Sequence, residues 1–221
     1  MTSASTSLNG QRVLVVGGAR DLGLAVAKAA GTAGATPVIG ARQGSSAAAA
    51  ASTIDGADWV VIDVTDEASV VAAFERAGSV DHVVVVASAH HNAPVTELDH
   101  DSLLAAFEAK VIGPMLLAKH AARVLPATGS IVLLAGLAAW TPTSSSAALA
   151  VTNGAVAFAA THLAKELAPI RANTISPGIV DSGSWDGWAS RRAPSSNARR
   201  RAPWSAGTES TVISPTLCSG C

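Results

Sequence analysis

The sequence predicts an α/β protein with a doubly wound parallel sheet in a single domain. Short apolar runs rich in β-branched residues alternate with helical stretches, and a glycine-rich turn joins the first run to the first helix. Strands that alternate with helices at this spacing are joined by crossovers into parallel sheets. The chain has 221 residues, which suffices for one such domain with a sizeable core.

The first strand and helix enclose the glycine turn. An apolar strand over 13–16 runs into Gly17 and Gly18, and a helix follows over about 22–33. Gly17 lets the chain leave the strand in a conformation that other residues resist, and Gly23 lets the helix pack close to the strand. The free N–H groups at the helix start would bind a pyrophosphate, so we predict a Rossmann-like, dinucleotide-binding turn. The alternative is a tight turn that binds nothing.

The second strand, over 36–42, ends in a basic residue. Arg42 stands where a site that prefers NAD has an acid, and no acidic residue lies between Asp21 and Asp55. Arg20 adds a second cation inside the glycine turn. Two guanidinium groups near the adenosine ribose would pair with a 2′-phosphate, so we expect NADP as the cofactor rather than NAD. The alternative is that both arginines are solvated surface residues.

The same patterns predict the later elements. Strands are expected over 58–63, 83–86, 131–134 and 170–175, and long helical stretches over 102–124 and 146–167. Thr65 is expected to cap a further helix that opens with Asp66 and Glu67, where the helix dipole favours acids. Gly113-Pro114 predicts a kink, because proline lacks an N–H and clashes with the preceding turn.

Composition and charge exclude several classes of protein. Apolar residues make up 49% of the chain, but no uninterrupted apolar run approaches the roughly 18 to 20 residues of a membrane-spanning helix. Residues 1–10 lack the features of a secretion signal, so we expect a flexible leader and a cytoplasmic protein. A net charge of −1 provides no field for nucleic acid or an anionic membrane. Cys218 and Cys221 lack a second ligand pair and the histidines are scattered, so no metal site is predicted.

From about Arg12 to Ser182 the sequence resembles the short-chain dehydrogenases/reductases. The turn at 16–23 is similar to the family's T-G-x-x-x-G-x-G, 81–88 stands in place of the strand that ends in N-N-A-G, and 165–178 matches the end-of-helix and P-G segment. The resemblance implies that Asp63 and Val64 contact the adenine and that Ser182 holds the nicotinamide carboxamide. Together with the turn and the arginines, the predicted cofactor-binding residues are Gly17, Gly18, Arg20, Leu22, Gly23, Arg42, Asp63, Val64, Ala87, Pro177, Gly178 and Ser182.

The sequence departs from the family pattern at the glycine turn and at the catalytic positions. Asp21 replaces the middle glycine of the turn and puts an anion beside the expected pyrophosphate. Leu149, Asn153 and Gly136 stand at the family's catalytic Tyr, Lys and Ser positions, and Lys110 stands at its Asn position. The chain contains no tyrosine, so proton transfer cannot use a phenol.

Other side chains could serve a carbonyl reduction, which needs a proton for the developing alkoxide. Lys110 could stabilise the oxyanion, or donate a proton if burial lowers its pKa; otherwise it is a solvated helix lysine. His90 and His91 follow the fourth strand at the carboxyl edge of the sheet and could act as acids, or be simply exposed. Thr152 and the serines at 144–146 offer hydroxyls, although those serines are expected to cap the following helix.

The domain is expected to span 11–182, and an irregular tail follows over 183–221. This tail is rich in Arg, Ser and Pro, and we interpret residues after about Trp188 as the product of a shifted reading frame, with a mobile basic arm as the alternative. The resemblance implies that this region forms a substrate-covering helix pair and a strand at a subunit interface. Whether the protein forms a homo-oligomer is therefore an open question at this point.

Two functions follow from these observations. The first is an NADP(H)-dependent oxidoreductase that acts on a small-molecule carbonyl or secondary alcohol with non-standard catalytic residues. The alternative is a catalytically silent nucleotide-binding protein of the same fold.

Overall fold

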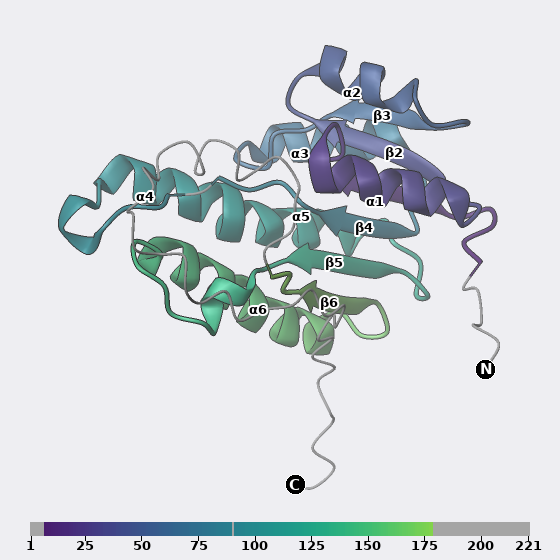
Figure 1. Cartoon of the computed structure of the whole chain (residues 1–221). Helices are drawn as coiled ribbons and strands as arrows, with labels where there is room; N and C mark the ends of the chain where they lie inside the picture. The colour runs from purple at the N-terminus through teal and green to yellow at the C-terminus, as the bar shows by residue number, and fades with distance from the viewer. Residues whose placement is uncertain (1–6, 90, 179–221) are drawn as a thin grey trace, which may run out of the picture.

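The computed structural model describes residues 7–89 and 91–178, which form a parallel sheet between two layers of helices (Figure 1). The six strands lie in the order β3-β2-β1-β4-β5-β6, and every neighbouring pair is parallel. This arrangement confirms the predicted doubly wound fold. The strands are β1 (Arg12–Val16), β2 (Thr36–Ala41), β3 (Asp58–Val61), β4 (His82–Val85), β5 (Ser130–Leu134) and β6 (Arg171–Ile175).

The helices divide between the two faces of the sheet. Along β1, Val13 and Val15 pack with α1 and α2, whereas Leu14 and Val16 pack with α3, α5 and α6. This alternation follows from the two-residue period of a strand, and the apolar runs are continuous because both faces are covered. The helices are α1 (Asp21–Thr32), α2 (Gly44–Ala51), α3 (Glu67–Ala77), α4 (His100–Phe107), α5 (Gly113–Ala121) and α6 (Ala147–Glu166).

Helix α2 has no counterpart in the sequence prediction. Five of its eight residues are alanines, so the sequence offers no contrast between an apolar and a polar face. The helix nevertheless buries Ala47, Ala50 and Ala51 against the sheet. Alanine is the best helix former, and its small side chain allows a close approach to the strands.

The long helical stretch before β5 begins at His100 and is interrupted earlier than predicted. A π-helical turn over Glu108–Ile112 separates α4 from α5, and Pro114 lies in the first turn of α5, where no N–H is required. A Cβ at Gly113 would lie 2.6 Å from the Val64 carbonyl oxygen, so this glycine lets α5 pack tightly. The irregularity takes the form of a π turn directly before Gly113-Pro114, and the kink expected at this pair stays a prediction.

Two predicted helix caps are wrong. Asp66, not Thr65, is the N-cap of α3, and its carboxylate accepts from the Ala68 N–H at 3.0 Å. The Thr65 hydroxyl instead donates to Asp63 at 2.8 Å. Ser146 precedes α6 but makes no side-chain cap, because its hydroxyl donates to the Thr143 carbonyl at 2.7 Å.

Helix α6 is, in the described part of the chain, the one helix long and apolar enough to cross a membrane. Its buried residues Val156 and Ala160 belong to the core cluster that packs against the sheet. Since the core helix of a globular protein passes the same test, we interpret α6 as part of the core.

Candidate functional site

The glycine turn between β1 and α1 is a cradle that side chains would fill. Gly17 adopts φ +86°, and a Cβ there would lie 2.7 Å from the Ala87 backbone nitrogen at the end of β4. A Cβ at Gly18 would lie 2.7 Å from the Val15 carbonyl oxygen, and one at Gly23 would clash with the Gly17 carbonyl oxygen. The predicted roles of these glycines therefore rest on both backbone conformation and space.

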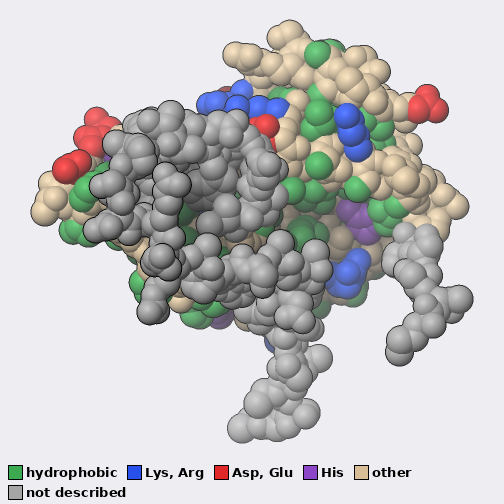
Figure 2. Space-filling view, viewed as in Figure 1, with side chains coloured by type: hydrophobic (Ala, Val, Ile, Leu, Met, Phe, Trp, Pro, Cys, Tyr) green, Lys and Arg blue, Asp and Glu red, His purple; other side chains and the backbone are tan. Residues whose placement is uncertain are grey.

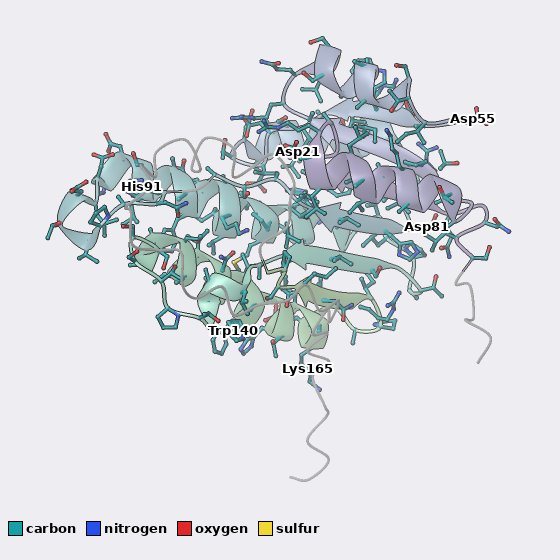
Figure 3. The ribbon with its side chains drawn as sticks, viewed as in Figure 1. Asp21, Asp55, Asp81, His91, Trp140 and Lys165 are labelled. Atoms are coloured by element: carbon teal, nitrogen blue, oxygen red, sulfur yellow. The ribbon has the colours of Figure 1, made fainter. Side chains whose placement is uncertain are left out.

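Helix α1 opens beside this cradle without a side-chain cap. Its N-cap residue, Arg20, is extended and makes no capping hydrogen bond, so the first N–H groups of α1 are not blocked by a side chain. Asp21 follows at φ +50°, and its carboxylate lies 3.6 Å from Nε of Arg20. The helix start thus combines N–H groups that no side chain caps with one exposed guanidinium and the carboxylate of Asp21, which Figure 3 labels.

The carboxyl end of β2 lies next to the same turn. The Gly40 carbonyl oxygen accepts from the N–H groups of Gly17 at 2.9 Å and Gly18 at 3.1 Å. Arg42 follows two residues later and is exposed. Gly40 was not predicted as a site residue; a Cβ there would lie 2.8 Å from the Ile62 side chain, and its strand position gave no signal of this role.

The ends of β3 and β4 contribute the next predicted residues. Asp63 accepts from the Thr65 N–H at 3.0 Å, in addition to the Thr65 hydroxyl, so this carboxylate is held by its own turn. The Val64 side chain is buried in the core. Ala87 donates its N–H to the Val16 carbonyl at 3.0 Å, which holds the end of β4 against the glycine turn.

Lys110 lies on the π turn and is only 3% exposed. Burial lowers the pKa of its amine from 10.5 to about 8. The π turn joins α4 to α5 and packs against α6, so the alternative of a solvated helix lysine is wrong. Single π turns inside α-helices occur frequently at functional sites.

Gly136 and Asn153 meet at the end of β5. A Cβ at Gly136 would lie 2.8 Å from Nδ2 of Asn153, and Asn153 itself is 2% exposed. Asn153 is not among the predicted site residues, although the resemblance puts it at the family's catalytic Lys position, and the structure places it beside the loop after β5. Thr152, one residue before it, donates its hydroxyl to the Ala148 and Leu149 carbonyl oxygens and is already satisfied within α6.

The remaining predicted residues are placed only in part. His91 is half-buried near Asp99, the N-cap of α4, and Figure 3 shows it well away from Asp21. Pro177 accepts from the Leu137 N–H at 3.0 Å, which joins the loops after β5 and β6. Gly178 is exposed, while His90 and Ser182 lie outside the described residues. No group of three metal-ligating side chains occurs within 7–89 and 91–178.

Comparison with known proteins decides the family. A family model described as Enoyl-(Acyl carrier protein) reductase matches residues 17–216. A short-chain dehydrogenase/reductase of an Acremonium species, ucsE, is 32% identical over 200 residues, which cover 81% of this chain and 76% of the relative. The chain belongs to the short-chain dehydrogenase/reductase family. This confirms the resemblance, and the oxidoreductases of this family use a nicotinamide cofactor.

Two further comparisons support the assignment to the short-chain dehydrogenases/reductases. The cis-4-hydroxycyclohexanecarboxylate dehydrogenase of Sinomonas cyclohexanicum is 38% identical over 188 residues, covering 78% of this chain and 74% of that protein. A dehydrogenase/reductase crystal structure from Sinorhizobium meliloti matches with a TM-score of 0.74 and 28% identity, covering 80% of this chain and 75% of that one.

The residues at the turn fit the family's nicotinamide nucleotide. The glycine cradle and the uncapped start of α1 suit a pyrophosphate, and Arg20 and Arg42 are both exposed. Asp21 is the one described residue at this helix start that opposes an anion, and Arg20 partly compensates its charge.

Proposed function

We propose that the protein is an NADP(H)-dependent oxidoreductase that interconverts a small-molecule carbonyl and a secondary alcohol. The observation that carries this proposal is the glycine cradle at the uncapped start of α1. The 38% identical relative is named as a dehydrogenase of a hydroxycyclohexane carboxylate, which is a secondary alcohol. Its name supports the substrate class.

The preference for NADP is argued from the two arginines. Arg42 follows β2, whose Gly40 carbonyl accepts hydrogen bonds from the glycine turn, so its backbone is held close to that turn and its exposed side chain can extend toward the expected adenosine ribose. The Arg20 side chain is 87% exposed and pairs with Asp21 at 3.6 Å, a contact that an exposed arginine can exchange for one with a ligand phosphate. Guanidinium groups pair with phosphate through two parallel hydrogen bonds, and no acidic residue at the end of β2 competes for the ribose hydroxyls.

Lys110 is the side chain we assign to proton transfer. The nucleotide, when bound, supplies the hydride, and the substrate oxygen then needs a positive charge or a proton. An amine with a pKa of about 8 is mostly protonated at pH 7 and can give up its proton near that pH. His91 lies beside the start of α4 and is the weaker candidate.

A catalytically silent nucleotide-binding protein is the second candidate function. The chain has no tyrosine, and the apolar Leu149 stands at the position of the family's proton donor. Under this alternative NADPH binds, but no ketone or alcohol is turned over. Turnover that Lys110→Met abolishes while NADPH still binds would select the first function.

The coenzyme preference is tested with Arg42→Ala. We expect wild-type protein to bind NADPH more tightly than NADH, and the variant to lose roughly tenfold in NADPH affinity with little change for NADH, because only NADPH carries the 2′-phosphate. Titration calorimetry measures both affinities. Arg123→Ala, which removes an exposed guanidinium after α5, should leave both unchanged. Equal losses for both coenzymes would contradict the proposed contact.

A further inference from the structure

Three polar side chains form a row across the amino ends of β4, β5 and β6. His82 lies opposite Ser130 in the register of β4 and β5, and Ser130 lies opposite Arg171 in the register of β5 and β6. Residues paired across neighbouring strands point to the same face of a sheet. Val13 pairs with His82 and belongs to the face that packs with α1 and α2, so the row lies on that face.

Hydrogen bonds join a serine, a histidine and a carboxamide at this row. Nδ1 of His82 lies 2.8 Å from the Ser130 hydroxyl, and Nε2 lies 3.0 Å from the carboxamide oxygen of Gln11. An amide oxygen can only accept, so Nε2 carries the ring proton and Nδ1 accepts from Ser130. The order is that of a nucleophile, a base and a third group that orients the base.

Ser146 shows that a buried serine does not by itself acquire such a partner. It is as buried as Ser130, since each residue is 7% exposed, but its hydroxyl donates to the Thr143 carbonyl at 2.7 Å. A backbone carbonyl cannot take up a proton at neutral pH, whereas an imidazole nitrogen can. The Ser130 hydroxyl is therefore bonded to a group that can remove its proton.

The backbone and the nearby charges support these roles. The Ser130 N–H donates to the Asp81 carbonyl at 3.2 Å, which fixes the start of β5 beside the residue that precedes His82. Burial lowers the pKa of His82, Asp81 partly opposes the shift and Arg171 adds to it, so the neutral ring predominates at pH 7. Arg171 is exposed, and its guanidinium can stabilise negative charge that develops on a carbonyl oxygen at Ser130.

We propose that Ser130 is a nucleophile that hydrolyses small carboxylic esters, with His82 as its general base and Gln11 as the residue that orients the ring. The serine oxygen bonds to the ester carbonyl carbon while Nδ1 takes the hydroxyl proton, and the ester C–O bond breaks as the alcohol leaves with that proton. Water then attacks the acyl group and gives a proton to Nδ1, and the serine regains this proton as the acid leaves. Because Ser130 is only 7% exposed, the acyl group has to be small.

This site is separate from the nucleotide site. The glycine cradle lies at the carboxyl end of β1, whereas His82 and Ser130 are the first residues of β4 and β5. Figure 3 shows Asp81, the residue before His82, well away from His91 in the loop after β4. The ester hydrolysis therefore does not rest on the proposed function, and NADPH should not change its rate.

The experiment treats the wild-type protein with a fluorophosphonate probe, which reacts covalently with activated serines, and locates the adduct by peptide mass spectrometry. We expect the adduct on Ser130. Ser130→Ala should hydrolyse p-nitrophenyl acetate roughly a hundredfold more slowly, and His82→Gln should slow labelling by a similar factor because it removes the base. Ser52→Ala, which changes an exposed serine whose hydroxyl donates to the Ala49 carbonyl at 2.8 Å, should leave both rates unchanged.

Thermal unfolding followed by circular dichroism identifies the variants that are folded. Labelling of the wild type needs no substitution, so it tests the proposal even where a variant does not fold. A wild-type protein whose Ser130 stays unlabelled, or whose adduct lies only on other residues, overturns the proposal. A folded Ser130→Ala protein that hydrolyses p-nitrophenyl acetate as fast as the wild type overturns it as well.

Discussion

Asp21 is the residue at which the glycine turn departs from an ideal anion site. Its carboxylate stands in the first turn of α1, beside the expected pyrophosphate. Two like charges about 4 Å apart repel by about 1 kcal/mol in water, which corresponds to roughly a fivefold change in affinity. We therefore expect Asp21→Asn to bind NADPH roughly fivefold more tightly in titration calorimetry. Asparagine tolerates the positive φ of this position, so the backbone should not change.

The control for this variant is Asp55→Asn. It removes the same charge from an exposed position that Figure 3 shows far from the start of α1. The net charge of the protein changes equally in both variants, so an equal gain would assign the effect to total charge and contradict the local repulsion.

We predict that the buried Lys110 lowers the free energy of unfolding of the wild-type protein. Burial shifts its pKa from 10.5 to about 8, and about 2.5 pH units correspond to about 3 kcal/mol at pH 7. We expect Lys110→Met to raise the free energy of unfolding by up to that amount and to abolish turnover. The unfolded state holds the Lys110 proton more tightly than the folded state, so the free energy of unfolding of the wild type rises between pH 8 and 10.5. The stabilisation by Lys110→Met therefore shrinks over the same range.

Urea unfolding at pH 7 and near pH 10 measures this effect. Lys28→Met changes an exposed lysine of α1 and should leave the free energy of unfolding nearly unchanged at both values. A destabilised Lys110→Met protein would contradict the assignment, because it would show that the charged amine contributes favourable contacts in the folded state.

At the level of elements, β4 begins with a titratable group at the amino edge of the sheet. Nδ1 of His82 lies 2.8 Å from the Ser130 hydroxyl and Nε2 lies 3.0 Å from the Gln11 carboxamide oxygen. That oxygen can only accept, so Nε2 carries the proton and Nδ1 accepts from Ser130. Burial lowers the pKa of His82, while nearby Asp81 partly opposes the shift.

The neutral ring of His82 therefore stabilises the sheet above about pH 6.5, the ordinary histidine value. As the pH falls below it, the unfolded state takes up a proton first and stability declines until the folded-state pKa is passed. Urea unfolding between pH 8 and pH 5 should show this decline, reduced in His82→Gln. His162→Gln, on the exposed side of α6, should follow the wild type. A His82→Gln curve parallel to the wild type would contradict the network's role.

At the scale of the molecule, local sequence patterns sufficed to predict the fold, but they did not suffice to predict all of the candidate site. Runs such as 83–86 and the glycines of the turn predicted strands and topology, because burial on both faces and backbone conformation leave direct marks in sequence. The resemblance puts Asn153 and Gly136 at two catalytic positions of the family, but their direct contact depends on the packing of α6 beside β5 and has no local signal in the sequence. Lys110 could be named in advance, but its burial depends on a π turn that no local pattern indicated.

The charge of the whole molecule determines how salt acts on coenzyme binding. The net charge is −1, and charged side chains are few on the visible part of the surface that the described residues form (Figure 2). Salt should therefore act mainly through the exposed Arg20 and Arg42, because contacts of exposed charges are screened over a Debye length of about 10 Å at 0.1 M. We expect NADPH affinity to fall several-fold between 0.05 and 0.5 M NaCl, and NADH affinity to fall less. In Arg42→Ala the salt dependences of NADPH and NADH affinity should converge. Titration calorimetry across the salt series measures both, and a larger loss of affinity with salt for NADH than for NADPH would contradict this account.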